Sequence, residues 1–265
     1  MKIGFIGLGN MATAIISGIL QKEMVSAQDM IGSDALETAR ERVKTKFNIT
    51  TVIDNREVAK EADILFLAVK PQFMQEVLVQ IADSISEKTV IVSIAAGKTI
   101  RFIEEALGRT DTKIIRCMPN TPALVLAGCT GVCAGDRVTK EELETVLGLL
   151  RSFGTASVVP ERLMDVVVGV SGSAPAYVFM FIEAMADEAV AEGMPRAQAY
   201  EFAAQAVLGS AKMVLETGRH PGELKDMVCS PGGTTIQAVK VLEEKGMRAA
   251  IMDAMEACIE KSRKL

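Results

Sequence analysis

Three small residues near the N-terminus have the spacing of a dinucleotide-binding loop. Gly7, Gly9 and Ala12 form the pattern G-x-G-x-x-G/A in KIGFIGLGNMA, directly after an apolar run and at the start of a helical pattern. Gly7 permits a tight turn, Gly9 lets the backbone approach a pyrophosphate, and Ala12 lets the helix pack closely on the strand. The N–H groups at the helix start then face the anion. A glycine turn that binds nothing is the alternative, but it does not explain this strand–loop–helix context.

Ser33 and Asp34 end the second predicted strand, where dinucleotide-binding folds distinguish NAD from NADP. An acid there binds the ribose hydroxyls, whereas a smaller or basic residue admits the phosphate. Asp34 would repel a phosphate if its carboxylate faced the ribose, but it is equally suited to cap the following helix. The sequence therefore predicts NADPH or NADH and leaves the choice between them open.

The elements that position this loop follow from the apolar pattern of the first 150 or so residues. Continuous apolar character, without alternation, is typical of strands covered on both faces. The predicted strands are Lys2–Ile6, Met30–Ser33, Ile64–Ala68, Val90–Ile94, Ile114–Met118 and Gly128–Cys133; the predicted helices are Met11–Gln21, Asp34–Lys46, Phe73–Ile81, Ile100–Leu107 and Lys140–Arg151. This order predicts an α/β fold with an N-terminal Rossmann-type, doubly wound, mostly parallel sheet.

From about Pro160 the strand pattern disappears and helical spacing takes over. The longest helical pattern is Arg196–Thr217, which Pro195 can open and Gly218 can close. We therefore expect a dinucleotide-binding domain over residues 1–160 and an all-helical C-terminal domain over residues 161–265. Because so few helices make only a thin bundle, a homodimer whose helical domains bury one another is expected. The alternative is a helical domain packed only on its own sheet.

Composition excludes several classes of function. The chain has 29 basic and 34 acidic residues and no long basic block, so nucleic acid is not an expected partner. Its five cysteines lack a C-x-x-C pair, and Cys129 and Cys133 have no histidine nearby, which predicts reduced thiols in the cytoplasm and no metal site. Glycines interrupt the apolar N-terminus, so a signal peptide is not expected, and no other segment reaches the roughly 18 unbroken apolar residues of a membrane span.

Six segments along the whole chain resemble those of the pyrroline-5-carboxylate reductases. They are, in order, GFIGLGNMA, FLAVKPQ, SIAAG, CMPNTPA, GVSGSAPAYVF and HPGELKDMVCSPGGTTIQAVKVLE. The last is the most specific, because G-x-G-x-x-A alone occurs in many unrelated dehydrogenases. The resemblance implies reduction of Δ1-pyrroline-5-carboxylate to L-proline by NADPH or NADH, the last step of proline synthesis, in a homo-oligomer with the dimer as its basic unit. Whether dimers assemble into a higher ring stays open.

The resemblance also implies which residues bind the cofactor. They are Ile6, Gly7, Leu8, Gly9, Asn10, Met11, Ser33, Asn55, Ala68, Val69, Lys70, Pro71, Ala95, Ala96 and Gly97. Lys70 follows a strand at the carboxyl edge of the sheet, where doubly wound folds bind ligands, and Pro71 fixes its turn. A solvated loop lysine is the alternative for Lys70, and a helix cap is the alternative for Asn55.

For the substrate, the resemblance implies contacts from Glu161, Asp226, Met227, Gly233, Thr234 and Thr235, with Thr235 at the ring nitrogen in a catalytic role. A helix predicted to begin near Thr234 presents unpaired N–H donors and a partial positive charge, which suits a substrate carboxylate. Capping of this helix is the alternative for both threonines. Glu161 and Asp226 are equally consistent with ordinary surface carboxylates.

The sequence leaves two alternative functions. A 3-hydroxyacid dehydrogenase shares the domain order but carries a catalytic lysine in its glycine-rich helix, and this chain has no lysine between Gly169 and Lys212. Alcohol dehydrogenation also needs a general acid–base, most often histidine, and the only histidine, His220, precedes Pro221 at a predicted helix start, where a structural role is expected. A non-catalytic NADPH-binding regulator is compatible with the fold.

Overall fold

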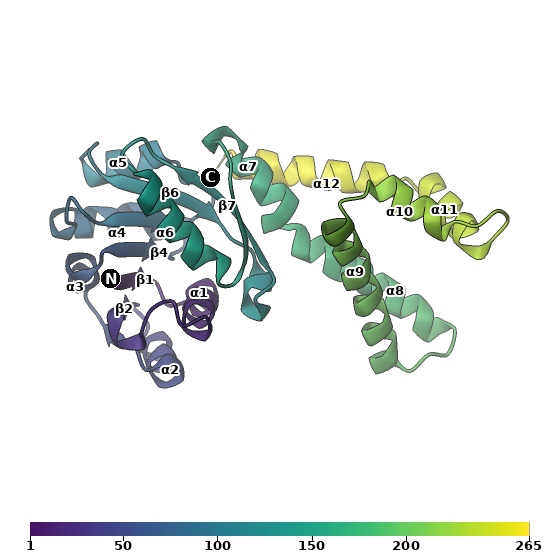
Figure 1. Ribbon diagram of the computed structural model, residues 1–265, viewed down its shortest axis with the longest axis horizontal. Coiled ribbons are helices and arrows are strands. Elements are labelled where there is room, and N and C mark those ends of the chain that lie inside the picture. The colour runs from purple at the N-terminus through teal and green to yellow at the C-terminus, as the bar shows by residue number, and fades with distance from the viewer. Residues whose placement is uncertain (265) are drawn as a thin grey trace. The chain divides into compact units, whose positions relative to one another are not determined.

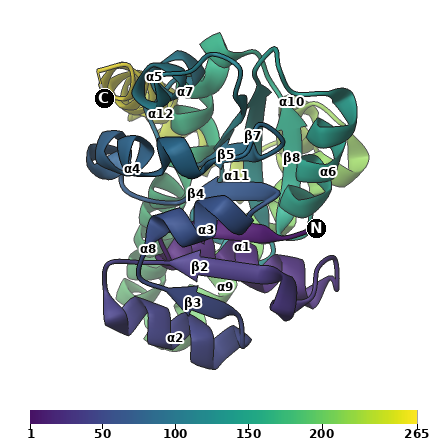
Figure 2. The ribbon, with the colours of Figure 1, turned by 90° about the vertical axis from the view of Figure 1, so that its left-hand side faces the viewer.

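The apolar segments of the N-terminal half form one eight-stranded sheet in the computed structural model, which describes residues 1–264. The strands are β1 (Ile3–Ile6), β2 (Met30–Ser33), β3 (Thr50–Val52), β4 (Ile64–Leu67), β5 (Val90–Ser93), β6 (Lys113–Met118), β7 (Gly128–Ala134) and β8 (Gly154–Val158). Their order is β3-β2-β1-β4-β5-β6-β7-β8. Strands β1 to β6 are parallel, β7 is antiparallel to β6, and β8 is parallel to β7. The predicted doubly wound, mostly parallel sheet is confirmed (Figure 2).

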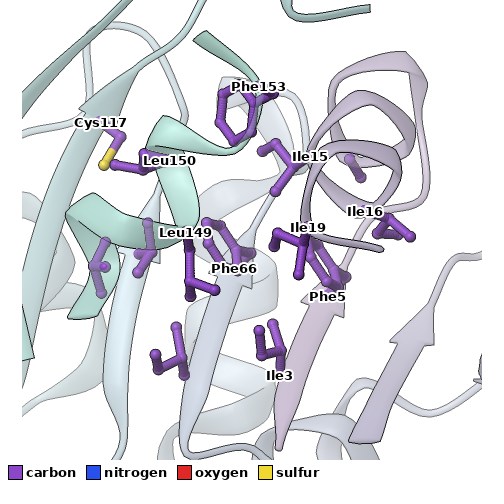
Figure 3. Close-up of a cluster of buried hydrophobic side chains, with 14 of the residues drawn as sticks. Ile3, Phe5, Ile15, Ile16, Ile19, Phe66, Cys117, Leu149, Leu150 and Phe153 are labelled. Atoms are coloured by element: carbon purple, nitrogen blue, oxygen red, sulfur yellow. The ribbon is translucent and has the colours of Figure 1, made fainter. Parts of the chain in front are cut away.

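Helices cover both faces of the sheet because the strands carry apolar side chains on both sides. Helices α1 (Asn10–Gln21), α2 (Glu37–Phe47) and α6 (Lys140–Arg151) share one core with the sheet, and α3 (Asn55–Glu61), α4 (Met74–Ile81) and α5 (Ile100–Leu107) share the other. In the first core, Phe5 and Phe66 stack with ring centroids 5.0 Å apart. Figure 3 shows these rings beneath the apolar side chains of α1 and the Leu149–Phe153 segment. The fixed packing of this core holds the carboxyl ends of β1 and β4 in place.

Sequence patterns missed β3, β8 and the extent of α3. The three residues of β3 and most of β8 are exposed or half-buried, so neither forms a continuous apolar run. Helix α3 buries only Val58 and Ala59 among polar neighbours. Edge elements of this kind lack the periodicity on which sequence prediction depends.

Only helices follow β8 within the described residues, as predicted. They are α7 (Met164–Val167), α8 (Ala174–Ala191), α9 (Arg196–Thr217), α10 (Pro221–Val228), α11 (Thr234–Glu244) and α12 (Met247–Ser262), with short single turns between some of them (Figure 1). The bounds of α9 agree with the prediction, and Gly218 ends it in the left-handed conformation, with φ 63°.

The chain forms two compact units. One comprises residues 1–173 with those from Cys258 onwards, and the other comprises residues 174–257. The end of α12 belongs to the first unit, where the Ser262 hydroxyl donates to Asp165 Oδ1 at 2.7 Å. The predicted domain boundary after residue 160 stays a prediction, because the sheet ends at Val158 while its compact unit continues to Ser173.

The helical unit leaves large apolar side chains exposed. Its buried apolar residues are Ala186, Ala199, Ala203 and Leu224, whereas Phe179, Met180, Phe202, Leu208 and Leu215 are each at least 60% exposed. The helical run Glu161–Ala191 is long and apolar enough to cross a membrane by length and composition, which for a lone helix is weak evidence. Large apolar side chains that are exposed together in one unit are typical of an interaction surface.

Candidate active site

The glycine loop lies where the strand order reverses. Strand β1 pairs with β2 on one side and with β4 on the other: the chain continues outward from β1 to β2 and β3, then crosses back to add β4 on the opposite side. Doubly wound folds bind ligands in the crevice at the carboxyl ends of such strands. The chain leaves β1 there through Gly7 to Gly9, and α1 begins at Asn10 with Gly9 as its N-cap. The predicted strand–loop–helix context is confirmed.

Gly7 and Gly9 are glycines for different reasons. Gly7 has a φ of +93°, and a Cβ atom there would lie 2.7 Å from the carbonyl oxygen of Ala68. Gly9 has a φ of −72°, which any residue adopts, and a Cβ atom there would meet no atom within 4 Å. The fold itself therefore requires Gly7. At Gly9 the space before the start of α1 is open, as close approach of a pyrophosphate to the backbone requires.

Side chains from the β2–α2 segment hold both backbone polar groups of Leu8. The Leu8 N–H donates to Asp34 Oδ2 at 2.8 Å, and Arg42 Nη2 donates to the Leu8 carbonyl at 2.7 Å. The other oxygen of Asp34 accepts the Leu36 N–H at 2.9 Å. Leu36 is the N-cap of α2, so Asp34 is not the cap of this helix. The Asp34 carboxylate instead fixes the glycine loop.

Ser33 and Asn55 lie together at the end of β2. Ser33 is fully buried, and its hydroxyl donates to Asn55 Oδ1 at 2.7 Å, while Asn55 Nδ2 donates to Gln80 at 2.7 Å. The N-cap of α3 is Asp54, whose carboxylate accepts the Arg56 N–H at 3.0 Å. The capping alternative for Asn55 is therefore wrong, because its side chain bonds across the sheet edge instead.

The remaining predicted cofactor residues follow β4 and β5, on the same edge of the sheet. The Ala68 N–H donates to the Ile6 carbonyl at 2.8 Å, which keeps residues 68–71 beside β1. Lys70 is exposed there, and Pro71 begins a single 3-10 turn. Residues 95–97 lie beyond the end of β5, with Gly97 at a φ of +72°. The structure thus brings the predicted cofactor residues to one edge, although they come from the ends of five separate strands.

Glu161 lies beside the start of α5, the helix that directly follows residues 95–99. Its Oε1 atom accepts the Ile100 N–H at 2.8 Å and an Nη1 hydrogen of Arg116 at 3.3 Å. An open groove of about 850 Å³ adjoins it and also includes Cys133 and Pro160 in its lining. Burial, with the nearby Glu161 charge, raises the pKa of the Cys133 thiol, so this cysteine stays protonated.

Sequence reasoning missed three arginines at this edge and near it: Arg40, Arg42 and Arg116. The side chain of Arg116 is only 4% exposed, and the pattern that could have identified it is a charged residue between apolar residues in the interior of the strand KIIRCM. Nothing in the local pattern of α2 distinguishes Arg40 and Arg42 from its other charges, because both donate to backbone carbonyls. Arg40 donates to Asp34 just before the helix, and Arg42 donates to Leu8, which the fold brings close.

In the helical unit, His220 is the N-cap of α10. The His220 Nδ1 atom accepts the Gly222 N–H at 3.0 Å and caps the helix, which confirms the predicted structural role. Asp226 is 73% exposed and pairs with Lys225 at 2.5 Å, whereas Met227 is half-exposed with its Sδ atom 3.7 Å from Arg219 Nη1. Both side chains therefore reach the surface of α10.

The turn before α11 has the geometry that its glycines suggest. Gly232 has a φ of +69°, and the Gly233 N–H donates to the Ser230 carbonyl at 3.0 Å. Gly233 is the N-cap and no side chain caps the helix, so Thr234 and Thr235 are its first two residues. The capping alternative for these threonines is therefore wrong. Their N–H groups belong to the helix start, which attracts anions.

Comparison with known proteins gives the family. The model for pyrroline-5-carboxylate reductase dimerisation matches residues 161–265, and the model for NADP oxidoreductase, coenzyme F420-dependent, matches residues 2–97. The chain is 57% identical over its whole length to pyrroline-5-carboxylate reductase of Escherichia coli (strain K12), covering 98% of that protein. It is 47% identical to the corresponding enzyme of Methanosarcina acetivorans, again over its whole length and covering 97% of that protein.

Solved structures agree with this result. A pyrroline-5-carboxylate reductase from Coxiella burnetii superposes with a TM-score of 0.92 at 35% identity, covering 99% of this chain and 97% of that one. The Plasmodium falciparum pyrroline carboxylate reductase with NADP bound gives 0.90 at 31% identity, covering 100% and 97%. A 3-hydroxyisobutyrate dehydrogenase from Mycobacterium tuberculosis, at 13% identity and 0.54, shares only the fold. With full-length relatives and a structural match over the whole chain, this protein belongs to the pyrroline-5-carboxylate reductase family.

Proposed function

We propose that this protein reduces Δ1-pyrroline-5-carboxylate to L-proline with a hydride from NADPH or NADH, as the last step of proline synthesis. The observation that carries this proposal is the glycine loop at the switch point, where the space at Gly9 is open although the backbone there needs no glycine. The chain is 57% and 47% identical, over its whole length, to two pyrroline-5-carboxylate reductases, and this similarity supports the choice of substrate.

The nicotinamide dinucleotide supplies the hydride, and this chain supplies its binding site. Gly9, Asn10 and Met11 start α1 and offer N–H groups to the pyrophosphate. Residues 68–71 and 95–97, together with Ser33 and Asn55, form the rest of the proposed site along the same edge of the sheet. Lys70 is exposed at this edge, as both the proposed cofactor role and the alternative of a solvated loop lysine require.

The start of α11 is the proposed site of the substrate carboxylate. Gly233 to Thr235 present backbone N–H groups and the positive end of the helix dipole, and no arginine is needed. Because neither threonine caps the helix, the Thr235 hydroxyl can orient the ring nitrogen. Glu161, Asp226 and Met227 are the further proposed substrate contacts.

Imine reduction needs little proton transfer from the protein. The substrate nitrogen is basic enough to arrive protonated, whereas a ketone would need a general acid such as histidine. His220 accepts a backbone N–H at the start of α10, which commits it to a structural role. This favours an imine substrate over a 3-oxoacid.

Replacement of Thr235 by alanine tests the catalytic assignment. We expect Thr235→Ala to lower kcat/KM for pyrroline-5-carboxylate by roughly 10-fold or more, the equivalent of about 1.4 kcal/mol in the transition state, with little change in cofactor affinity or Tm. Thr139 is a matched control, because it caps α6 in a capping box with Glu142. Thr139→Ala should lower Tm and keep kcat/KM. If Thr235→Ala behaves like Thr139→Ala, the assignment is wrong.

The competing functions are separated by one assay. Oxidation of reduced nicotinamide is followed by its ultraviolet absorbance when purified protein is mixed with pyrroline-5-carboxylate or with a 3-oxoacid. Turnover of the first substrate alone is expected. Turnover of the 3-oxoacid would indicate a hydroxyacid dehydrogenase, and turnover of neither would indicate a regulator.

Homo-oligomers follow from the dimerisation segment of the family at residues 161–265. Within this proposal, residues 1–160 bind the dinucleotide, residues 161–265 bind the substrate and form the dimer, and dimers can assemble into a higher ring. The apolar helices face a second copy rather than a bilayer, and α8 carries Glu183, Asp187 and Glu188 among its apolar residues. We accordingly place the protein in the cytoplasm, without membrane or nucleic-acid partners.

A further inference from the structure

We propose that Arg40 makes this reductase select NADPH over NADH by pairing with the 2′-phosphate. The inference rests on the proposed dinucleotide-dependent function and decides between its two cofactors. It concerns the turn between β2 and α2, where a Rossmann fold reads the adenosine ribose.

The guanidinium of Arg40 is held over this turn by the backbone. Its Nη1 atom donates to the carbonyl of Asp34 at 2.6 Å and to that of Ala35 at 3.2 Å. Arg40 is half-buried, so its position is restricted although it reaches solvent. Both bonds use one nitrogen of a planar fork with five N–H donors, and the fork can pair with two oxygens of a phosphate.

The position of Asp34 in the sequence suggests that its carboxylate could repel a phosphate, but the structure directs this carboxylate elsewhere. Its two oxygens accept the N–H groups of Leu8 and Leu36, so the carboxylate is directed to the backbone. The charges of Arg40 and Arg42 balance those of Asp34 and the exposed Glu37, and the N-terminus of α2 adds a partial positive charge. The turn is therefore not an acidic site of the kind that excludes NADP.

Ser33 and Arg42 are less suited to the phosphate than Arg40. Ser33 is fully buried and its hydroxyl donates to Asn55, so its side chain is covered. Arg42 donates to the Leu8 carbonyl and thereby supports the glycine loop, which both cofactors use. These contacts give the two arginines separate roles: Arg42 positions the loop, and Arg40 determines specificity.

Arg40→Gln tests this assignment in the full-length protein. With saturating pyrroline-5-carboxylate, we expect KM for NADPH to rise about tenfold or more, the loss of one charge-assisted hydrogen bond, while KM for NADH changes less than about twofold. Lys44→Gln removes the same charge from an exposed position on the same helix and should change neither KM. Arg42→Gln should raise both, because it releases the loop.

A binding measurement separates this inference from the proposed reaction. By calorimetry, the wild-type protein should bind adenosine 2′,5′-bisphosphate at least about tenfold more tightly than 5′-AMP, and Arg40→Gln should remove this difference. Equal effects of Arg40→Gln on both ligands, or none on either, would overturn the role of Arg40 while leaving the reductase function intact. If the wild-type protein turns over pyrroline-5-carboxylate with neither cofactor, the proposed function itself fails.

Discussion

At the scale of single residues, the glycine loop combines two different requirements within three positions. Gly7 has a positive φ and no room for a Cβ atom beside the Ala68 carbonyl, whereas Gly9 has an ordinary φ and open space. A motif match requires glycine at both positions but does not show which of them the fold itself needs. The difference matters because the fold explains why residue 7 is glycine, whereas only a bound ligand explains why residue 9 is glycine.

Substitution of these glycines should separate folding from binding. Gly9→Val should abolish NADPH binding and lower the free energy of unfolding by no more than about 1 kcal/mol, because its side chain enters space that only the pyrophosphate needs. Gly7→Val should destabilise the fold itself, because the backbone is left-handed there and the Cβ atom would clash. Both are checked by cofactor titration and thermal unfolding. NADPH affinity that survives in a folded Gly9→Val variant would contradict the loop assignment.

At the scale of elements, Glu161 links three segments that are distant in the sequence. Its carboxylate accepts the first N–H of α5 and pairs with Arg116 of β6, while Glu161 itself follows β8. The link fixes the start of α5 and hence the connection over residues 95–99. A carboxylate at a helix N-terminus is also favoured by the helix dipole.

Glu161→Gln tests this link. The amide can still accept the Ile100 N–H but leaves the buried Arg116 guanidinium without a counter-ion, so the free energy of unfolding should fall by about 1.5–3 kcal/mol. The matched control is Glu105→Gln, because Glu105 pairs with Arg101 on the exposed surface of α5, and its loss should cost less than about 1 kcal/mol. Chemical denaturation at fixed protein concentration compares them. Equal stability of the Glu161 variant and the wild type would show that the pair is not stabilising.

At the scale of the whole molecule, the helical unit is incomplete without a second copy. Only small side chains and Leu224 are buried within it, while its large apolar side chains are exposed. The family model for dimerisation covers this segment. Burial of the apolar faces between two copies explains why a thin bundle can be stable.

Phe202→Glu should therefore break the oligomer. Phe202 is 60% exposed on α9, and a buried carboxylate in a dimer interface would lack a partner. Val79→Glu on α4 is a control of the same exposure on the sheet-containing unit and should leave the mass unchanged. Light scattering after size-exclusion chromatography gives the mass of each. A Phe202→Glu variant with wild-type mass would exclude this face of α9 from the interface.

The sequence alone determined the features that are local in the chain. Apolar runs gave six of the eight strands, helical spacing gave α5, α6 and α9 with their bounds, and the spacing of Gly7, Gly9 and Ala12 located the dinucleotide loop. These patterns are readable because strand and helix periodicity, turns and caps depend on neighbouring residues. The family resemblance added the prediction that the start of α11, with Thr234 and Thr235, contacts the substrate.

Tertiary structure alone decided what the polar side chains contact. Asp34 binds Leu8, Ser33 binds Asn55, and Glu161 binds Ile100, and the partners lie 26, 22 and 61 residues apart. Strand order brings these pairs together, and no local pattern encodes it. Sequence reasoning therefore left capping as an alternative for Asp34, Asn55 and the two threonines of α11, and the backbone geometry of each helix start removed it. The physical reason is that a side chain bonds to whatever the fold places beside it, which the residue's own neighbours in the chain do not specify.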